Sequence, residues 1–123
     1  MYELKILSEF AAAHQLREFS GSCERLHGHN WKVEVHVTGE DTGDNGLVLD
    51  FREIKEATKK TLEEMDHRFL NDLPAFQEKN PSSENIARLI FDTLSARINR
   101  PGVRVSKVTA WESDTAAASY LEP

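Results

Sequence analysis

The sequence predicts an α+β fold, with one four-stranded antiparallel sheet and two helices on one face of it. Its 123 residues suffice for a single domain, which we expect to span residues 1–123. Segments whose apolar residues alternate every second position stand at both ends of the chain, as in strands with one buried face. Two segments with apolar residues at helical spacing lie between them. The expected order is therefore strand, strand, helix, helix, strand, strand.

Two strands open the chain. From Tyr2 to Phe10 the chain alternates, with Tyr2, Leu4 and Ile6 on one parity, and the small residues 11–13 lead to His14. Residues 17–25 are expected to form a loop, since they include a Ser-Gly-Ser turn signal. The second strand has one buried face, made of Trp31, Val33, Val35 and Val37, and one polar face, made of Lys32, Glu34, His36 and Thr38. Gly39 and the polar residues 40–46 end this strand.

Each helix is expected to begin at a polar capping residue. Asp50 caps the first helix, and Glu53 stands three residues later, as in a capping box. The buried face of this helix runs to about Met65 and comprises Ile54, Ala57, Thr58, Thr61, Leu62 and Met65. After a turn at Pro81, Ser82 or Ser83 caps the second helix, which residues 99–102 end. Its apolar face comprises Ile86, Leu89, Ile90, Leu94 and Ile98.

Residues 103–112 and 117–121 have strand character and complete the expected sheet. A four-stranded sheet has two edges whose backbone groups lack partners. Small domains commonly cover such edges by joining sheets between subunits. We therefore expect the protein to form an oligomer.

The composition excludes several classes of function. The net charge is −6, from 21 acidic and 15 basic residues, and no basic block is present, which argues against nucleic acid as a partner. No apolar run is long enough to span a membrane, and the first residues do not resemble a secretory leader, so we expect a cytoplasmic protein without a membrane partner. Cys23 is the single cysteine, which excludes an internal disulfide and a cysteine-rich zinc finger.

Three histidines give the strongest indication of chemistry. His27 and His29 share the parity of Trp31, so both rings are expected on the buried face of the second strand. Two adjacent, partly desolvated imidazoles are costly unless something shares their lone pairs, as a metal ion does. His14 ends the neighbouring strand and supplies a third imidazole. Three imidazoles suit zinc and leave one coordination position open for water or substrate.

These residues also fit other interpretations. His27 and His29 alone would equally fit two surface histidines, and Cys23 could supply the fourth ligand of a structural zinc. His36 has the opposite parity and is assigned no role. Asp66 and His67 follow the first helix, where the helix dipole favours a protonated imidazole and the adjacent carboxylate tunes it. A solvent-facing helix end would explain that pair equally well.

Six separate motifs, in order along the chain, resemble the 6-pyruvoyl-tetrahydropterin synthase family. They are residues 10–14, 23–30, 49–51, 62–67, 81–85 and 111–112. Within this family the chain looks most like the bacterial 6-carboxy-tetrahydropterin synthases of queuosine precursor synthesis. The resemblance extends from about residue 4 to residue 120. It implies the tunnelling fold (T-fold), in which three subunits join their sheets into a barrel and two such trimers stack.

The resemblance also implies roles for individual residues. It assigns zinc to His14, His27 and His29, and the catalytic thiol to Cys23. Asp66 and His67 would form a proton-shuttling pair contributed across a subunit interface. Glu112 would anchor the pterin ring. The implied reaction converts 7,8-dihydroneopterin triphosphate to 6-carboxy-tetrahydropterin, with loss of acetaldehyde and triphosphate.

Three alternatives accompany this reading. Some relatives use a glutamate near the position of Glu24 and release a hydroxymethyl pterin for folate synthesis, and others form 6-pyruvoyl-tetrahydropterin from the same substrate. A protein without enzymatic activity could instead keep the fold as an oligomeric pterin binder, with zinc held structurally by the three histidines and Cys23. The triphosphate needs a local basic patch or backbone donors, and the start of the second helix could supply N–H groups.

Overall fold

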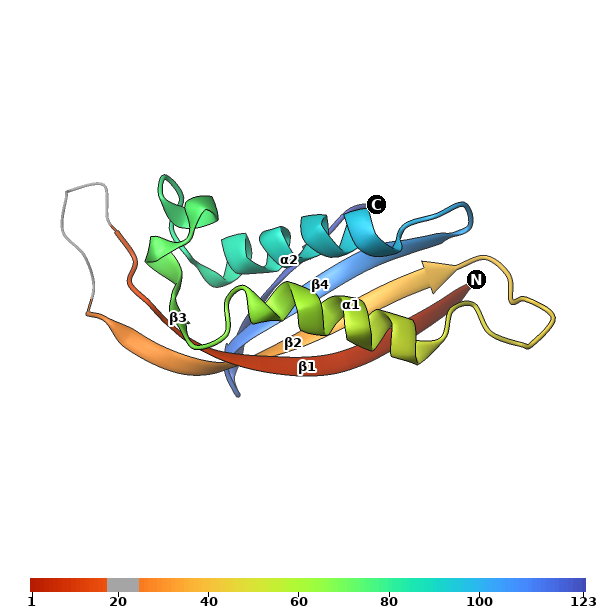
Figure 1. The fold of residues 1–123 in the computed structure, drawn as a ribbon, viewed down its shortest axis with the longest axis horizontal. Coiled ribbons are helices and arrows are strands. Elements are labelled where there is room, and N and C mark those ends of the chain that lie inside the picture. Colours follow the sequence, from red (N-terminus) through yellow and green to blue (C-terminus); the bar gives the residue numbers. More distant parts are fainter. Residues whose placement is uncertain (18–24) are drawn as a thin grey trace.

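The computed structural model describes residues 1–17 and 25–123. In these residues α1 and α2 lie together on one face of a curved sheet, as Figure 1 shows. The elements in chain order are β1 (Tyr2–His14), β2 (His27–Gly39), α1 (Phe51–Glu63), β3 (Arg68–Phe69), η1 (Leu70–Asp72), η2 (Pro74–Phe76), α2 (Ser83–Ile98), β4 (Val103–Ser113) and β5 (Ala116–Leu121).

The sheet has five strands in the order β3-β1-β2-β4-β5, so the predicted count of four is wrong. The prediction of a wholly antiparallel sheet is also wrong, because β3 pairs with β1 in parallel. β3 has only two residues, which is too short for any periodicity to reveal. It forms because the chain after α1 lies against β1, where the N–H of His67 donates to the carbonyl of Ala11 at 2.6 Å. This contact anchors the Asp66-His67 segment to the sheet.

The predicted buried faces are confirmed. Even-numbered residues of β1 and odd-numbered residues of β2 turn toward the helices, and Trp31, Val33, Val35 and Val37 have no exposed surface. The buried stripe of α2 lies against β4 and β5 and includes Ile86, Ile90 and Leu94. Burial of these side chains holds the two layers together.

Both helices begin at predicted capping residues. The Asp50 carboxylate accepts from the N–H of Arg52, and the Ser82 hydroxyl accepts from the N–H of Asn85. Glu53 does not complete the predicted capping box, because its carboxylate pairs with Arg100. None of the helices in the described part of the chain is long and apolar enough to cross a membrane.

A β-bulge changes the parity of β4. Its register against β2 shifts between His36 and Val37, so that Val37 pairs with Val105 while Val35 pairs with Val108. The extra residue in β4 makes the inward positions odd-numbered before Ser106 and even-numbered after it. Val105, Val108 and Ala110 are accordingly all buried. The same change turns Glu112 toward the helix side of the sheet.

Candidate functional site

The three predicted histidines converge at the end of the sheet where β1 ends and β2 begins. His14 and His27 are the final pair in the β1–β2 register, and His29 pairs with Ala12 two positions along. All three have the parity that faces the helices, as the sequence pattern predicts. The antiparallel register therefore brings together residues that lie thirteen or more positions apart in the chain.

Glu112 joins the histidines. Its Oε1 lies 3.1 Å from Nε2 of His14, 3.5 Å from Nε2 of His27 and 3.0 Å from Nε2 of His29. Nε2 of His14 and Nε2 of His27 are 3.1 Å apart. One ligand atom from each of the four residues falls within 4.8 Å of the others. The donor set of three imidazoles and one carboxylate can hold a metal ion.

The rings of His14 and His27 are oriented by main-chain carbonyls. Nδ1 of His14 lies 2.8 Å from the Pro81 carbonyl, and Nδ1 of His27 lies 2.8 Å from the Arg25 carbonyl. A carbonyl oxygen only accepts, so each Nδ1 carries a proton, and in the neutral ring Nε2 presents its lone pair. Such partners orient the imidazole ligands of metal sites in general. The Pro81 contact also places the start of α2 beside this group.

The surroundings of His29 favour a neutral ring. Burial lowers the pKa of His29, with the neighbouring rings of His27 and His14 acting in the same direction against the raising effect of Glu112. Its Nε2 is buried and lies 3.0 Å from Oε1 of Glu112, a contact without full hydrogen-bond geometry. A buried imidazole nitrogen that faces a carboxylate and two further imidazoles fits a metal ligand.

Trp31 supports the histidines from beneath. Its ring meets His14 and His29 edge-on at 5.1 Å and 5.5 Å between centroids. The Trp31 side chain is fully buried and stacks on Phe10. These contacts with the fixed Trp31 ring restrict the rotamers of His14 and His29.

Asp66 and His67 form a second cluster. Nδ1 of His67 lies 3.0 Å from Oδ1 of Asp66, and the same oxygen accepts from the N–H of Ala11 at 2.9 Å. The Ala11 bond, followed by the His67 ring, lowers the pKa of Asp66. His67 has a φ of 59°, a left-handed conformation that residues other than glycine rarely adopt. The anchored carboxylate thus holds an exposed imidazole at the end of α1.

The second cluster borders an open cleft of about 360 Å³ lined by Glu9, Phe10, Ala11, Asn30, Asp66 and His67. Glu9, Ala11 and Asn30 have the parity of the sheet face that lacks helices. The histidines around Glu112 have the opposite parity. The two clusters of one chain therefore open onto opposite faces of the sheet.

Three further residues weighed in the sequence analysis are Cys23, Glu24 and His36. Cys23 and Glu24 lie outside the described residues. His36 is buried on the helix-free side, beside Glu3 and Glu34, as its parity predicts. The sequence pattern did not predict that Glu112 lies beside the histidines. The break in alternation between Val105 and Val108 is the signal that could have done so.

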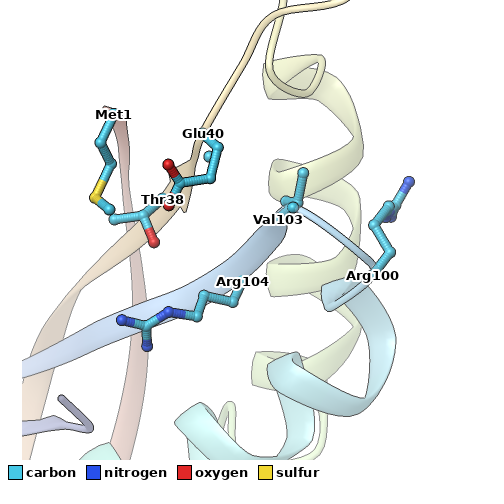
Figure 2. Close-up of a pocket in the computed structure, with 8 residues that line it drawn as sticks. Met1, Thr38, Glu40, Arg100, Val103 and Arg104 are labelled. Carbon is cyan, nitrogen blue, oxygen red and sulfur yellow. The ribbon is translucent and has the colours of Figure 1, made fainter.

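A second cavity, of about 310 Å³, lies at the opposite end of the sheet and contains Arg100 and Arg104 (Figure 2). Arg100 is paired with Glu53 and donates to the Ile98 carbonyl, so its charge is compensated. The cavity adjoins Met1 and Gly39, at the far end of β1 and β2 from His14. Thirteen-residue strands separate the two places by about 40 Å. These arginines therefore do not serve the histidine cluster of their own chain.

The chain is similar in sequence and in fold to one group of known proteins. The sequence profile of the 6-pyruvoyl tetrahydropterin synthase family matches residues 3–123. A 6-carboxy-5,6,7,8-tetrahydropterin synthase of Synechocystis is 37% identical, over 93% of this chain and 88% of its own length. A protein of Pyrococcus furiosus named dihydroneopterin monophosphate aldolase is 36% identical, over 87% of this chain and 86% of its own. The structure of Caenorhabditis elegans 6-pyruvoyl tetrahydropterin synthase is similar with a TM-score of 0.88 at 27% identity, covering 99% of this chain and 96% of that one.

Proposed function

The chain belongs to the 6-pyruvoyl tetrahydropterin synthase family, and from this we propose that it is a zinc-dependent 6-carboxy-5,6,7,8-tetrahydropterin synthase. In this proposal it acts in the cytoplasm, in queuosine precursor synthesis. It converts 7,8-dihydroneopterin triphosphate and one water molecule to 6-carboxy-tetrahydropterin, acetaldehyde and triphosphate. The convergence of the His14, His27 and His29 side chains is the observation that carries the proposal.

The donor set supports zinc as the metal. Zinc binds imidazole nitrogens at about 2.0–2.1 Å in tetrahedral geometry, which separates neighbouring ligand atoms by about 3.3 Å. Four of the six contacts among the three imidazoles and Glu112 measure 3.0–3.5 Å, and all six lie within 4.8 Å. When bound, zinc would supply Lewis-acid stabilisation of the negative charge that develops on substrate oxygens.

The protein side chains supply the proton transfers in this proposal. Cys23 acts as a thiolate base toward the substrate side chain. The bond from Nδ1 of His67 to Asp66 fixes the ring, which leaves Nε2 to exchange a proton with substrate. Glu112, as an ionised carboxylate, accepts from the paired N–H groups of the pterin edge.

Assembly would complete the site. Because the histidine cluster and the Asp66–His67 pair of one chain open onto opposite faces, we assign each active site one cluster from each of two subunits. Joining of sheets through their edge strands into a barrel, as a trimer or a dimer of trimers, would bring such clusters together.

The test of the proposed function is the identity of the product. Purified protein loaded with zinc is incubated with 7,8-dihydroneopterin triphosphate, and the products are identified by mass spectrometry. We expect 6-carboxy-tetrahydropterin with one acetaldehyde per turnover. An untouched substrate, with zinc fully bound, would refute the enzymatic proposal and favour an oligomeric pterin-binding protein.

A second candidate is an aldolase or folate-type reaction that releases a hydroxymethyl pterin. It is favoured by Glu24 next to Cys23 and by the relative named dihydroneopterin monophosphate aldolase. The same product analysis separates it, because glycolaldehyde or a phosphorylated equivalent would replace acetaldehyde. Formation of 6-pyruvoyl-tetrahydropterin without any aldehyde would indicate instead a 6-pyruvoyl-tetrahydropterin synthase.

Cys23→Ala separates a catalytic thiol from a structural zinc ligand. We expect zinc content and oligomeric state to stay unchanged while kcat falls about 10²–10⁴-fold, the usual size of a general-base contribution. Zinc is measured by atomic absorption, and oligomers by sedimentation. Loss of zinc or of the oligomer would instead make Cys23 a fourth, structural ligand.

Glu112→Gln tests whether the carboxylate binds pterin or metal. Glutamine keeps the shape but removes the charge-assisted bonds to the pterin, which are worth about 1.5–3 kcal/mol. We expect KM to rise about 10–150-fold while zinc affinity stays within about tenfold of wild type. Binding is measured by competition with a chromophoric chelator. A zinc affinity that falls further than KM rises would make Glu112 primarily a metal ligand.

A further inference from the structure

Two asparagine side chains hold the chain just beyond β1. The Asn71 amide accepts from the N–H of Gln15 at 2.9 Å and donates to the carbonyl of Gln15 at 2.7 Å. The Asn80 amide makes the same two bonds with the main chain of Arg17, both at 2.7 Å. Each amide supplies one donor and one acceptor, as a residue of a neighbouring strand would. The two asparagines thus act as strand partners for residues 15 and 17.

Asn80 is itself fixed from two further directions. The guanidinium of Arg17 donates to the carbonyls of Phe76, Gln77 (2.8 Å) and Lys79 (3.3 Å), which precede Asn80 in the chain. The side-chain amide of Asn85, in the first turn of α2, donates to the Asn80 carbonyl at 2.8 Å. The segment between η2 and α2 is therefore tied at several points to the chain that follows His14.

This segment delivers the carbonyl that orients His14. Pro81 directly follows Asn80, and its carbonyl lies 2.8 Å from Nδ1 of His14, with both residues buried. The proline ring fixes φ, so the direction of the carbonyl depends on how Asn80 and Ser82 are held. Ser82 is held by its capping bond to Asn85, and Asn80 by the contacts described above.

We propose that Asn80 is a positioning residue for the metal site, acting through the Pro81 carbonyl on the ring of His14. The inference rests on the metal site proposed above. Asn80 contacts neither the imidazoles nor Glu112 among the described contacts, so its effect is on the orientation of His14 and not on ligation. Residues that support a metal ligand in this way typically change metal affinity by about 10–100-fold when they are replaced.

The experiment compares Asn80→Ala with Asn71→Ala, which removes an equivalent pair of main-chain bonds, to Gln15, and has no link to Pro81 among the described contacts. Zinc affinity is measured by chelator competition, and thermal stability by circular dichroism. We expect both variants to lose similar stability, whereas zinc binding weakens about 10–100-fold in Asn80→Ala and at most about threefold in Asn71→Ala. Equal losses of zinc affinity in the two variants, or none in Asn80→Ala, would overturn the proposal.

A second readout keeps the test independent of zinc and of folding failure. In the metal-free protein, the Nδ1 proton of His14 gives an NMR signal shifted by its bond to Pro81, and we expect this signal to broaden or move in Asn80→Ala but not in Asn71→Ala. If wild-type protein binds no zinc, the proposed metal site fails, and this signal still decides the role of Asn80. Should Asn80→Ala not fold, Asn85→Ala removes one bond to Asn80 and is expected to show about a 2–10-fold loss of zinc affinity.

Discussion

Replacing His29 with alanine is expected to weaken zinc binding more than about 100-fold, beyond the usual effect of losing a residue that only supports a ligand. Turnover of 7,8-dihydroneopterin triphosphate is lost with the metal. His29 is a better histidine to replace than His14, because its side chain is 24% exposed whereas that of His14 is 1% exposed. The substitution therefore removes one imidazole of the proposed metal site and leaves the packed core almost unchanged. Zinc affinity and product formation are measured together.

His36→Ala is the matched control for this variant. His36 is also a β2 histidine, and it lies beside a carboxylate, with Nδ1 3.3 Å from Oε1 of Glu3. Its side chain faces the helix-free side of the sheet. We expect normal zinc binding and normal turnover in this variant. A His29→Ala protein that still binds zinc with wild-type affinity would contradict the proposed metal site.

The second large effect is expected from His67→Ala, and it tests how the active site is assembled. Alone, this variant should bind zinc normally and lose about 10²–10⁴-fold in kcat, because the ring that exchanges a proton is gone. Mixed with inactive His29→Ala protein, unfolded and refolded together, it should regain activity. An active site then needs an unsubstituted metal cluster from one chain and an unsubstituted Asp66–His67 pair from another. Random assembly of a 1:1 mixture meets both conditions at about a quarter of the sites.

The refolded single variants and refolded wild type serve as controls for the mixture. Asp66→Asn should behave as His67→Ala does in every assay, because the carboxylate that orients the ring becomes an amide. If the mixture is no more active than either variant alone, each site must use both clusters of the same chain. The opposite placement of the two clusters on the sheet would then have no part in assembly.

Alternation along the strands was sufficient to predict the histidine cluster. His27 and His29 share the parity of the buried Trp31, and an antiparallel neighbour brings the end of β1 beside them. The structure confirms both points through the pairing of His14 with His27. Parity is a local property of the chain, which is why it can be read before the fold is known.

Features that depend on contacts between distant segments were not predictable in this way. β3 exists because residues 67–69 lie against β1, and its two residues carry no pattern of their own. The pairing of Asn80 with the main chain of Arg17 joins residues 63 positions apart. Glu112 reaches the histidines because a bulge changes the parity of β4, and a strand assumed to be regular from Val103 onward places it on the other face.

The irregularity at Ser106 limits how this scaffold can be redesigned. Regular strands are usually preferred in engineering because they are easier to specify and more stable. Deleting Ser106 would make β4 regular and move every later side chain of the strand to the opposite face of the sheet. Val108, Ala110 and Glu112 would then all leave the side that faces the helices. The apolar interior and the position of the Glu112 carboxylate beside the histidines thus depend on the same inserted residue. A redesign of β4 at this residue therefore changes the core packing and the position of Glu112 at the same time.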